Sequence, residues 1–240
     1  MIGRHSGIIG KPPTQPDTWM SQARKWTRHG SVLAKPEITK AMREGWIVVY
    51  PEKYVLEDNC IALQLHEVFW RQDPGGFRKE YSTLNPGNLD QIKLLWKLDR
   101  ALTYDEMMER YPKERIVTKP WPESTKFIYV KPHEQILACT DVVLGVYGIM
   151  VGYFVTKSCP ARQGGQTVAC SNEVRVNTTN RPVLELSNRL EMPVIFPIGP
   201  PITTVTFELL TSPILPKSTP DAAQICGKWT PESMLRAYLG

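Results

Sequence analysis

The sequence lacks the cysteine patterns of secreted and zinc-binding proteins. Its 240 residues include five cysteines, at positions 60, 139, 159, 170 and 226, and no two of them are spaced as Cys-x-x-Cys. An odd number of widely spaced cysteines argues against a disulfide scaffold and against a zinc site, and favours a reducing compartment. A hairpin would let Cys159 and Cys170 face each other, so a disulfide between these two cysteines remains an alternative. The first residues do not read as a signal peptide, so we expect none.

Motifs for common catalytic chemistry are also absent. None of the four histidines lies in HExxH, and none is followed by the Glu and Pro-Cys-x-x-Cys with which zinc deaminases activate water. The sequence has no GxSxG elbow, no GxxxxGK loop followed by Ser or Thr, and no GxGxxG that continues into a helix with an acidic residue downstream. We therefore predict that the chain is not an enzyme and that it holds neither a cofactor nor a metal.

Two groups of reactive side chains have a simpler interpretation. Cys139 lies in an apolar run, where cysteine usually behaves as a small buried hydrophobe and not as a thiolate nucleophile. Asp105, Glu106 and Glu109 fall in the first turns of an expected helix, where negative charge suits the helix dipole. Neither group predicts acid–base or nucleophilic chemistry.

One apolar run raises the question of a membrane span. Residues 136–155, ILACTDVVLGVYGIMVGYFV, contain a single charge, Asp141, and are as long as a spanning helix. The run is rich in Val, Ile and Tyr and contains three glycines, which favours two buried strands that turn at glycine. We therefore predict no membrane insertion.

Basic charge is concentrated near the N-terminus. Residues 1–45 contain eight Lys or Arg against Asp17, Glu37 and Glu44, and so account for the whole net charge of +5. The rest of the chain holds equal numbers of basic and acidic residues. A basic N-terminal face on a neutral body is the electrostatic feature that a function has to explain.

The apolar pattern predicts helices in the first half of the chain. Residues 1–16, rich in glycine and proline, are expected to form a flexible arm. Helices are expected over 17–29, 35–45, 89–102 and 103–111, the last with a capping box made by Thr103 and Glu106. Residues 46–50 are expected to form a strand, whereas residues 60–70 read as a strand at first and then as a helix.

Short runs rich in β-branched residues predict strands in the second half. They are separated by Pro, Gly and Asn turns and occupy residues 126–130, 136–155, 167–176, 183–187, 193–198 and 202–210, before a last helix over 231–239. We therefore predict an α+β fold in which a helical N-terminal half packs on a mainly antiparallel β C-terminal half. Residues 17–240 are expected to form a single domain, with residues 119–122 as a candidate seam.

The expected helix over 17–30 provides a candidate partner-binding site. It combines two tryptophans, seven residues apart and so on one face, with three basic residues; the set is Trp19, Arg24, Lys25, Trp26 and Arg28. Aromatic rings beside cations are what single-strand binders use, and Trp and Arg also dominate the energetic centres of protein interfaces. Alternatively, both tryptophans dock the helix onto the body. We predict a protein-binding surface, with single-stranded nucleic acid as the alternative partner.

Seven blocks of the chain carry a resemblance to a known family. They read EGWIVVYPEKY, CIALQLHEVF, EYSTLNPG, LWKLDRALTYDEMMERYP, KPWPESTKFIYV, LGVYGIMVGYFVTKSC and NRPVLELSNRLEMPVIFPIGPPITTVTFELL. Together they resemble the Bet accessory proteins of foamy viruses (spumaretroviruses), and more narrowly the large part that the second Bet reading frame encodes. The resemblance runs from about Asp17 to the end of the chain.

This resemblance implies a non-enzymatic viral accessory protein. Bet-like proteins bind and sequester host APOBEC-type cytidine deaminases and block their packaging and antiviral action, so the expected role is restriction-factor antagonism and immune evasion. The alternative is a single-stranded nucleic-acid-binding or transcription-regulating viral protein that uses the basic, Trp-containing N-terminal helix.

The resemblance also implies a location but no residue-level site. It places the protein in the host cytoplasm, with a nuclear pool tied in the family to a basic segment near the C-terminus. This chain ends CGKWTPESMLRAYLG, without such a segment. The partner-binding assignment above therefore depends on this chain's own residues, and the oligomeric state stays open.

Overall fold

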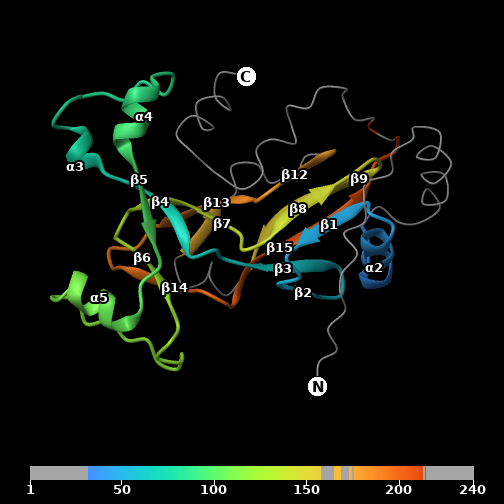
Figure 1. Ribbon diagram of the computed structural model, residues 1–240, viewed down its shortest axis with the longest axis horizontal. Coiled ribbons are helices and arrows are strands. Elements are labelled where there is room, and N and C mark those ends of the chain that lie inside the picture. The colour runs from blue at the N-terminus through green and yellow to red at the C-terminus, as the bar shows by residue number, and fades with distance from the viewer. Residues whose placement is uncertain (1–31, 158–164, 169–172, 175, 213, 215–240) are drawn as a thin grey trace.

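The computed structural model describes residues 32–157, 165–168, 173–174, 176–212 and 214, and these form a mainly β molecule (Figure 1). Strand accounts for 43% of the structure and helix for 16%. The helices are α2 (Lys35–Arg43), α3 (Pro74–Phe77), α4 (Leu89–Leu95) and α5 (Tyr104–Arg110). The strands are β1 (Ile47–Tyr50), β2 (Tyr54–Leu56), β3 (Cys60–Gln64), β4 (Val68–Gln72), β5 (Trp96–Arg100), β6 (Phe127–Val130), β7 (Gln135–Cys139), β8 (Val143–Val146), β9 (Met150–Thr156), β10 (Gly165–Val168), β11 (Glu173–Val174), β12 (Thr178–Asn180), β13 (Val183–Asn188), β14 (Val194–Pro197) and β15 (Pro201–Leu209).

The strands form four sheets. Two of them have five strands, in the orders β11-β9-β15-β3-β2 and β10-β13-β7-β4-β5. A three-stranded sheet has the order β1-β8-β12, and β14 pairs with β6 in a two-stranded sheet. Every pair of these strands is antiparallel.

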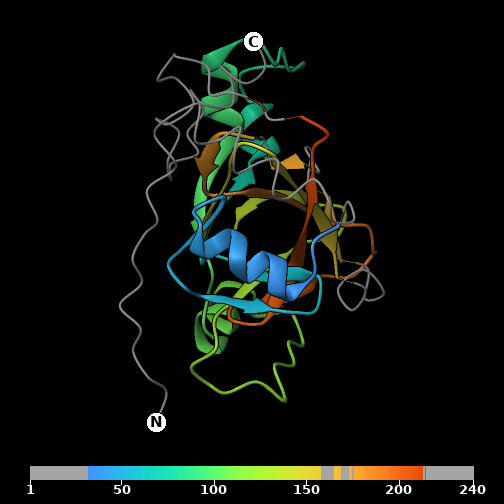
Figure 2. The same cartoon turned by 90° about the vertical axis from the view of Figure 1, so that its right-hand side faces the viewer.

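The first sandwich lies between the β11-β9-β15-β3-β2 sheet and the three-stranded sheet. Its core combines β3 and β15, through Ile61 and Phe207, with β8, through Leu144 and Val146. Helix α2 lies across one end of this sandwich, the end that faces the viewer in Figure 2. Its Ile38 and Ala41 are fully buried against the same core, as its apolar spacing predicts.

The second sandwich lies between the β10-β13-β7-β4-β5 sheet and the two-stranded sheet. Phe69 from β4, Ile136 from β7 and Leu184 from β13 meet Ile128 and Phe196 from the facing strands. A smaller apolar cluster beside it joins Met107 of α5 to Phe127 and Tyr129 of β6. Helices α3, α4 and α5 all lie at this end of the molecule (Figure 1).

The chain passes between the sandwiches where three connections lie side by side. The β3–β4 connection bonds to the end of β7, through His66 N to Cys139 O at 2.8 Å. The β7–β8 connection in turn bonds to the residues before β13, through Thr140 N to Pro182 O at 3.0 Å. These backbone bonds therefore hold the crossing segments together between the two sandwiches.

The predicted fold class is wrong. We expected a helical N-terminal half on a β C-terminal half, but strands from both halves interleave in the same sheets. β1 pairs with β8, β3 with β15, and β4 with β7. β1, β3 and β4 of the first half each pair with a strand of the second half, and this long-range pairing is not visible in local periodicity.

Several local predictions are confirmed. The helix expected over 35–45 is α2, and Gly45 follows it with φ +80°. The strand expected over 46–50 is β1, and the capping box of Thr103 and Glu106 is present at α5. The ambiguous residues 60–70 form two strands, β3 and β4.

Other expectations are corrected or fall outside the described residues. The helix expected over 89–102 ends at Leu95, and the chain continues as β5. Residues 136–155 belong to β7, β8 and β9 with a turn at Gly148, and none of the helices in the described ranges could cross a membrane. The arm over 1–16 and the helices over 17–29 and 231–239 lie outside the described residues. The single-domain prediction and its candidate seam at 119–122 stay predictions.

Candidate functional site: a buried arginine and carboxylate network

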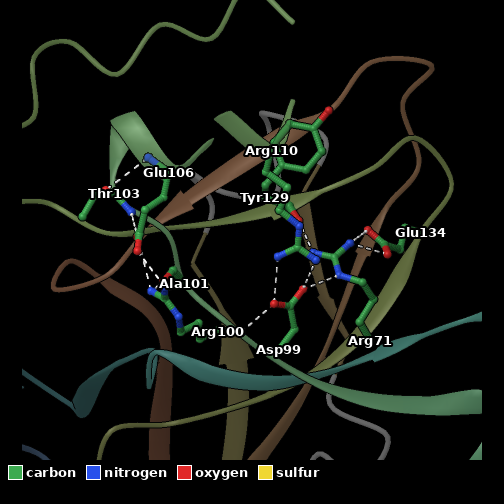
Figure 3. A network of polar contacts seen from close by, with 9 residues as sticks. All are labelled: Arg71, Asp99, Arg100, Ala101, Thr103, Glu106, Arg110, Tyr129 and Glu134. Carbon is green, nitrogen blue, oxygen red and sulfur yellow. Dashed lines mark hydrogen bonds and ion pairs between the residues drawn. The ribbon is translucent and has the colours of Figure 1, made fainter. Parts of the chain in front are cut away.

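Arg71 is a charged side chain inside the second sandwich. It lies on β4 two residues after Phe69, so both side chains point inward and both residues are buried. Its Nε donates to Asp99 Oδ2 at 3.0 Å, its Nη1 contacts both carboxylate oxygens of Glu134 at 2.5 Å, and its Nη2 donates to the Tyr129 carbonyl at 2.6 Å (Figure 3). Since an unpaired buried charge is strongly unfavourable, these three partners are what allow an arginine here.

Asp99 is shared by two arginines. It lies on β5 opposite Phe69, and Arg110 from α5 approaches it with both terminal nitrogens, at 2.9 and 3.0 Å. Burial alone would raise the pKa of the Asp99 carboxyl, but bonds from Arg110, the Arg100 backbone and Arg71 outweigh it and hold the pKa below its usual value. Asp99 is therefore a carboxylate at neutral pH.

The N-terminus of α5 adds an exposed extension to this network. Glu106 accepts from the Thr103 backbone N–H at 2.8 Å, and Arg100 donates to it at 2.6 and 3.3 Å (Figure 3). The bond from Arg100, followed by the bond from the Thr103 backbone, lowers the pKa of Glu106 to about 2. The two ends of α5 are thus held by β5, because Arg100 and Asp99 are neighbours on that strand.

Aromatic rings cover the inner side of the network. Tyr111 and Tyr129 stack with ring centroids 4.0 Å apart and planes 16° from parallel. The Arg71 guanidinium lies 5.3 Å from the Phe69 ring centroid, and that of Arg110 lies 5.7 Å from the Tyr111 ring. Burial raises the pKa of Tyr129 to about 12, so its hydroxyl is neutral.

The network is internally balanced. Arg71 and Arg110 carry the charge that Asp99 and Glu134 neutralise, and Glu134 also accepts from the Lys131 backbone N–H at 2.7 Å. An incoming anion would have to displace one of these carboxylates. The arrangement therefore fits a structural role, which is to hold α5 and β6 against the sheet.

A second polar cluster lies where the chain crosses between the sandwiches. His66 accepts from the Val68 N–H at 3.1 Å through Nδ1, and Asp141 pairs with Lys53 at 2.9 Å. Arg181 lies close enough to influence His66 and Cys139, and its buried Nε has no hydrogen-bond partner among the described residues. Burial, reinforced by Arg181, lowers the pKa of His66, so the imidazole is neutral near pH 7.

Cys139 in this cluster is not an activated nucleophile. Burial raises the pKa of its thiol to about 11, despite the nearby guanidinium of Arg181. A thiol with that pKa holds a negligible thiolate fraction at neutral pH. The interpretation of Cys139 as a small buried group is supported by this environment.

The His, Cys, Asp and Glu side chains do not gather into a metal-binding cluster in the parts of the chain that the structure describes. No three of them there lie close enough together to hold an ion. His133, which is near Cys139 in sequence, instead pairs with Glu191 at 3.1 Å on the surface.

The predicted partner-binding residues cannot be placed. Trp19, Arg24, Lys25, Trp26 and Arg28 all lie outside the described residues, so their assignment stays a prediction. Sequence reasoning missed the buried network. Its one local signal was Arg71 at an inward-facing position of an apolar strand, two residues from Phe69.

Comparison with known proteins finds similarity only at the level of structure. No family model matches the chain, and no curated protein matches it. The 2′-deoxycytidine 5′-triphosphate deaminase of Agrobacterium tumefaciens matches with a TM-score of 0.50 and 13% identity, over 75% of this chain and 48% of the deaminase. This chain therefore spans about half the length of that protein.

Two dUTPases match more weakly. The EIAV enzyme has a TM-score of 0.32 and 16% identity, over 39% of this chain and 76% of its own. A point mutant of the dUTPase from phage phi11 of S. aureus has a TM-score of 0.32 and 10% identity, over 43% of this chain and 88% of its own.

These comparisons correct the prediction that the chain is not an enzyme. That prediction relied on the absence of local catalytic motifs, whereas the structure that matches with a TM-score of 0.50 is that of an enzyme. Local motifs were too narrow a criterion, because a site can be assembled from residues far apart in sequence. At 13% identity the deaminase shows a likeness of fold, and the described part of this chain is similar to it in fold.

Proposed function

We propose that the protein binds host APOBEC-type cytidine deaminases and sequesters them, which blocks their packaging and antiviral action. The proposal is carried by the blocks that resemble foamy virus Bet, since these blocks supply strands to both sandwiches, among them β3 and β15 of the first and β6 and β13 of the second. The resemblance is therefore not confined to one element of the β framework.

The described surface offers apolar contacts for such a partner. Large apolar side chains are exposed at Tyr50, Leu98, Val117 and Met192. Arg71 and Arg110 are already paired with carboxylates, so contacts with a partner would depend on these apolar groups and on other exposed charges. Sequestration needs area and complementarity, roughly 800 Å² per partner for a standard interface.

Co-precipitation against a panel of such deaminases tests the proposal. The double variant Trp19→Ala, Trp26→Ala is expected to lose the deaminase without a change in melting temperature. Trp121→Ala is the matched control, because its side chain is exposed on the described surface. Absence of every deaminase from the precipitate of the unchanged chain would refute the function, whereas retention by the double variant would refute only the site.

A second candidate function is binding or conversion of a pyrimidine deoxynucleoside triphosphate. The observation in its favour is the fold likeness to the 2′-deoxycytidine 5′-triphosphate deaminase, at a TM-score of 0.50. Thermal unfolding with and without 2′-deoxycytidine 5′-triphosphate, followed by chromatography of the nucleotide, tests it. A melting temperature that the nucleotide leaves unchanged, together with unconverted nucleotide, would eliminate this candidate.

A further inference from the structure

Strand β5 forms one edge of a five-stranded sheet. Among the described strands it pairs along its length with β4 alone, which lies on one side of it. Beyond its end, Leu102 exchanges backbone bonds with Phe127 at 2.8 and 2.9 Å. Residues Trp96–Arg100 thus present their second side without a described strand beside it.

The hydrogen bonds between β5 and β4 show which backbone groups of β5 face the free edge. Asp73 N donates to Leu95 O, and Ala101 N donates to Glu67 O, both at 2.7 Å. In an antiparallel ladder the residues that bond to the partner strand alternate. Lys97 and Asp99 therefore direct their backbone groups toward β4, and Leu98 directs its N–H and C=O outward.

The side chains of β5 divide between two faces. Trp96, Leu98 and Arg100 share the outer face, and Lys97 shares the inner face with Asp99. Leu98 is 62% exposed, which is high for a leucine, and its outward backbone groups have no described strand beside them. The outward N–H groups of Trp96 and Arg100, by contrast, already bond to Ile92 O and to Asp99 Oδ1. An exposed apolar edge strand is a template for pairing with another strand.

We propose that two copies of this chain pair edge to edge through β5, antiparallel, with the two-fold axis at Leu98. The segment Trp-Lys-Leu-Asp-Arg is chemically self-complementary in this register. Leu98 lies opposite its own copy, Lys97 lies opposite the partner's Asp99, and Trp96 lies opposite the partner's Arg100. Opposite charges meet on one face, and a cation meets an aromatic ring on the other.

A two-fold axis makes every such contact occur twice. The N–H and C=O of Leu98 bond reciprocally with those of its copy, and the two five-stranded sheets become one continuous sheet. A parallel arrangement would place like residues side by side, Lys97 on Lys97 and Asp99 on Asp99, and is disfavoured for that reason.

The dimer is expected to be weak and dependent on concentration. One short strand buries less than the roughly 1,200 Å² at which stable interfaces begin. Asp99 already pairs with Arg71 and Arg110 of its own chain, so the partner's Lys97 would add a third cation to a carboxylate that is largely neutralised. Backbone pairing and Leu98 therefore carry most of the association.

Sedimentation velocity over a wide concentration range tests the pairing. The full chain is expected to shift from monomer toward dimer as concentration rises, and Leu98→Lys is expected to stay monomeric because it puts two like charges on the axis. Met192→Lys is the matched control, since Met192 is also 62% exposed but lies outside β5. Unchanged dimerisation of Leu98→Lys, or a full chain that stays monomeric throughout, would overturn the proposal.

Cross-linking tests the register. Opposed residues that bond through their backbones have Cα atoms about 5.5 Å apart, within the range of a disulfide. Leu98→Cys is therefore expected to form a disulfide-linked dimer under mild oxidation, whereas Met192→Cys and the unchanged chain are not. If Leu98→Cys fails to cross-link while remaining folded and dimeric, the copies meet through another surface.

Proline at the same position tests the backbone contribution. Proline is tolerated on an edge strand where the lost N–H faces outward, so Leu98→Pro should keep the fold and lose the dimer. A folded Leu98→Pro chain that still dimerises like the parent would contradict backbone pairing at this edge.

Discussion

The helices that cover the two sandwiches are held by different interactions. At the first, α2 lays Ile38 and Ala41 on the core beside Trp46, all three fully buried. At the second, α5 is held by ions, with Arg110 on Asp99 and Glu106 on Arg100. Apolar burial is indifferent to pH, whereas ion pairs depend on ionisation and, where exposed, on salt. The ends of this molecule should therefore respond differently to the same change of conditions.

The largest expected effect is at the apolar end. Trp46→Ala should lower the free energy of unfolding by about 4 kcal/mol, because it leaves a large cavity in a fully buried site. Urea denaturation measures it. Trp121→Ala, at an exposed tryptophan, should change stability by no more than about 0.5 kcal/mol. Equal losses in the two variants would show that Trp46 is not part of the core.

A smaller loss of stability is expected when an arginine is removed from the ionic network. Arg71→Met should cost about 3 kcal/mol, since it leaves buried carboxylates with fewer partners. The loss is held down because Asp99 keeps Arg110 and Glu134 keeps the Lys131 N–H. Urea denaturation of Arg71→Met measures this loss. The control is Lys53→Met, which breaks the more exposed ion pair with Asp141 and should lower the free energy of unfolding by no more than about 1 kcal/mol.

The N-terminal cap of α5 should contribute less to stability than Arg71 does. Thr103→Ala removes the side-chain acceptor of the Glu106 N–H and should cost about 1 kcal/mol. Thr103→Ser should restore most of the loss in the same denaturation measurement, because serine caps as well as threonine. Failure of serine to restore stability would point to packing of the threonine methyl group instead.

The corresponding change at α2 should stabilise the protein. Its N-cap residue Ala34 is exposed and extended and makes no side-chain cap, while Glu37 occupies the third helical position. Ala34→Ser should therefore create a capping box and add about 0.5–1 kcal/mol. A thermal melt that rises for Ala34→Ser but not for Ala34→Val would confirm that the hydroxyl is responsible.

The smallest expected effect is a difference in acid sensitivity between the two ends. The pKa of Glu106 falls from 4.5 to about 2 in the folded chain, and that of Asp99 is also lowered. Groups with a depressed folded pKa stabilise the fold above the unfolded pKa, and this contribution is lost as pH falls through the folded pKa. Stability of the unchanged chain should thus fall between pH 4.5 and about 2.

Glu106→Gln isolates this contribution. Its stability should be lower than that of the parent at neutral pH, and the difference should shrink as pH falls toward 2. Denaturation midpoints measured at several pH values give the comparison. A difference that stays constant across that range would mean that ionisation of Glu106 does not support α5.

Part of the candidate site was accessible from local sequence. The capping box at Thr103 and Glu106 follows from residue types three positions apart, and it is present. The buried network was not accessible, because its members come from distant segments: Asp99 lies 28 residues from Arg71, and Glu134 lies 63 residues from it. Only the pairing of β5 and β7 with β4 brings them together.

Sequence alone determined the elements whose causes are local. The spacing of Ile38 and Ala41 and the stop at Gly45 specify α2, alternation specifies β13, and a run rich in β-branched residues specifies β15. Tertiary structure decided the rest. Trp96–Arg100 continue a helical apolar stripe, yet they form a strand because β4 offers backbone partners and Arg71 offers a charge for Asp99. Backbone bonds between strands and pairs of buried charges join residues far apart along the chain, so their energy enters only when the whole sheet forms.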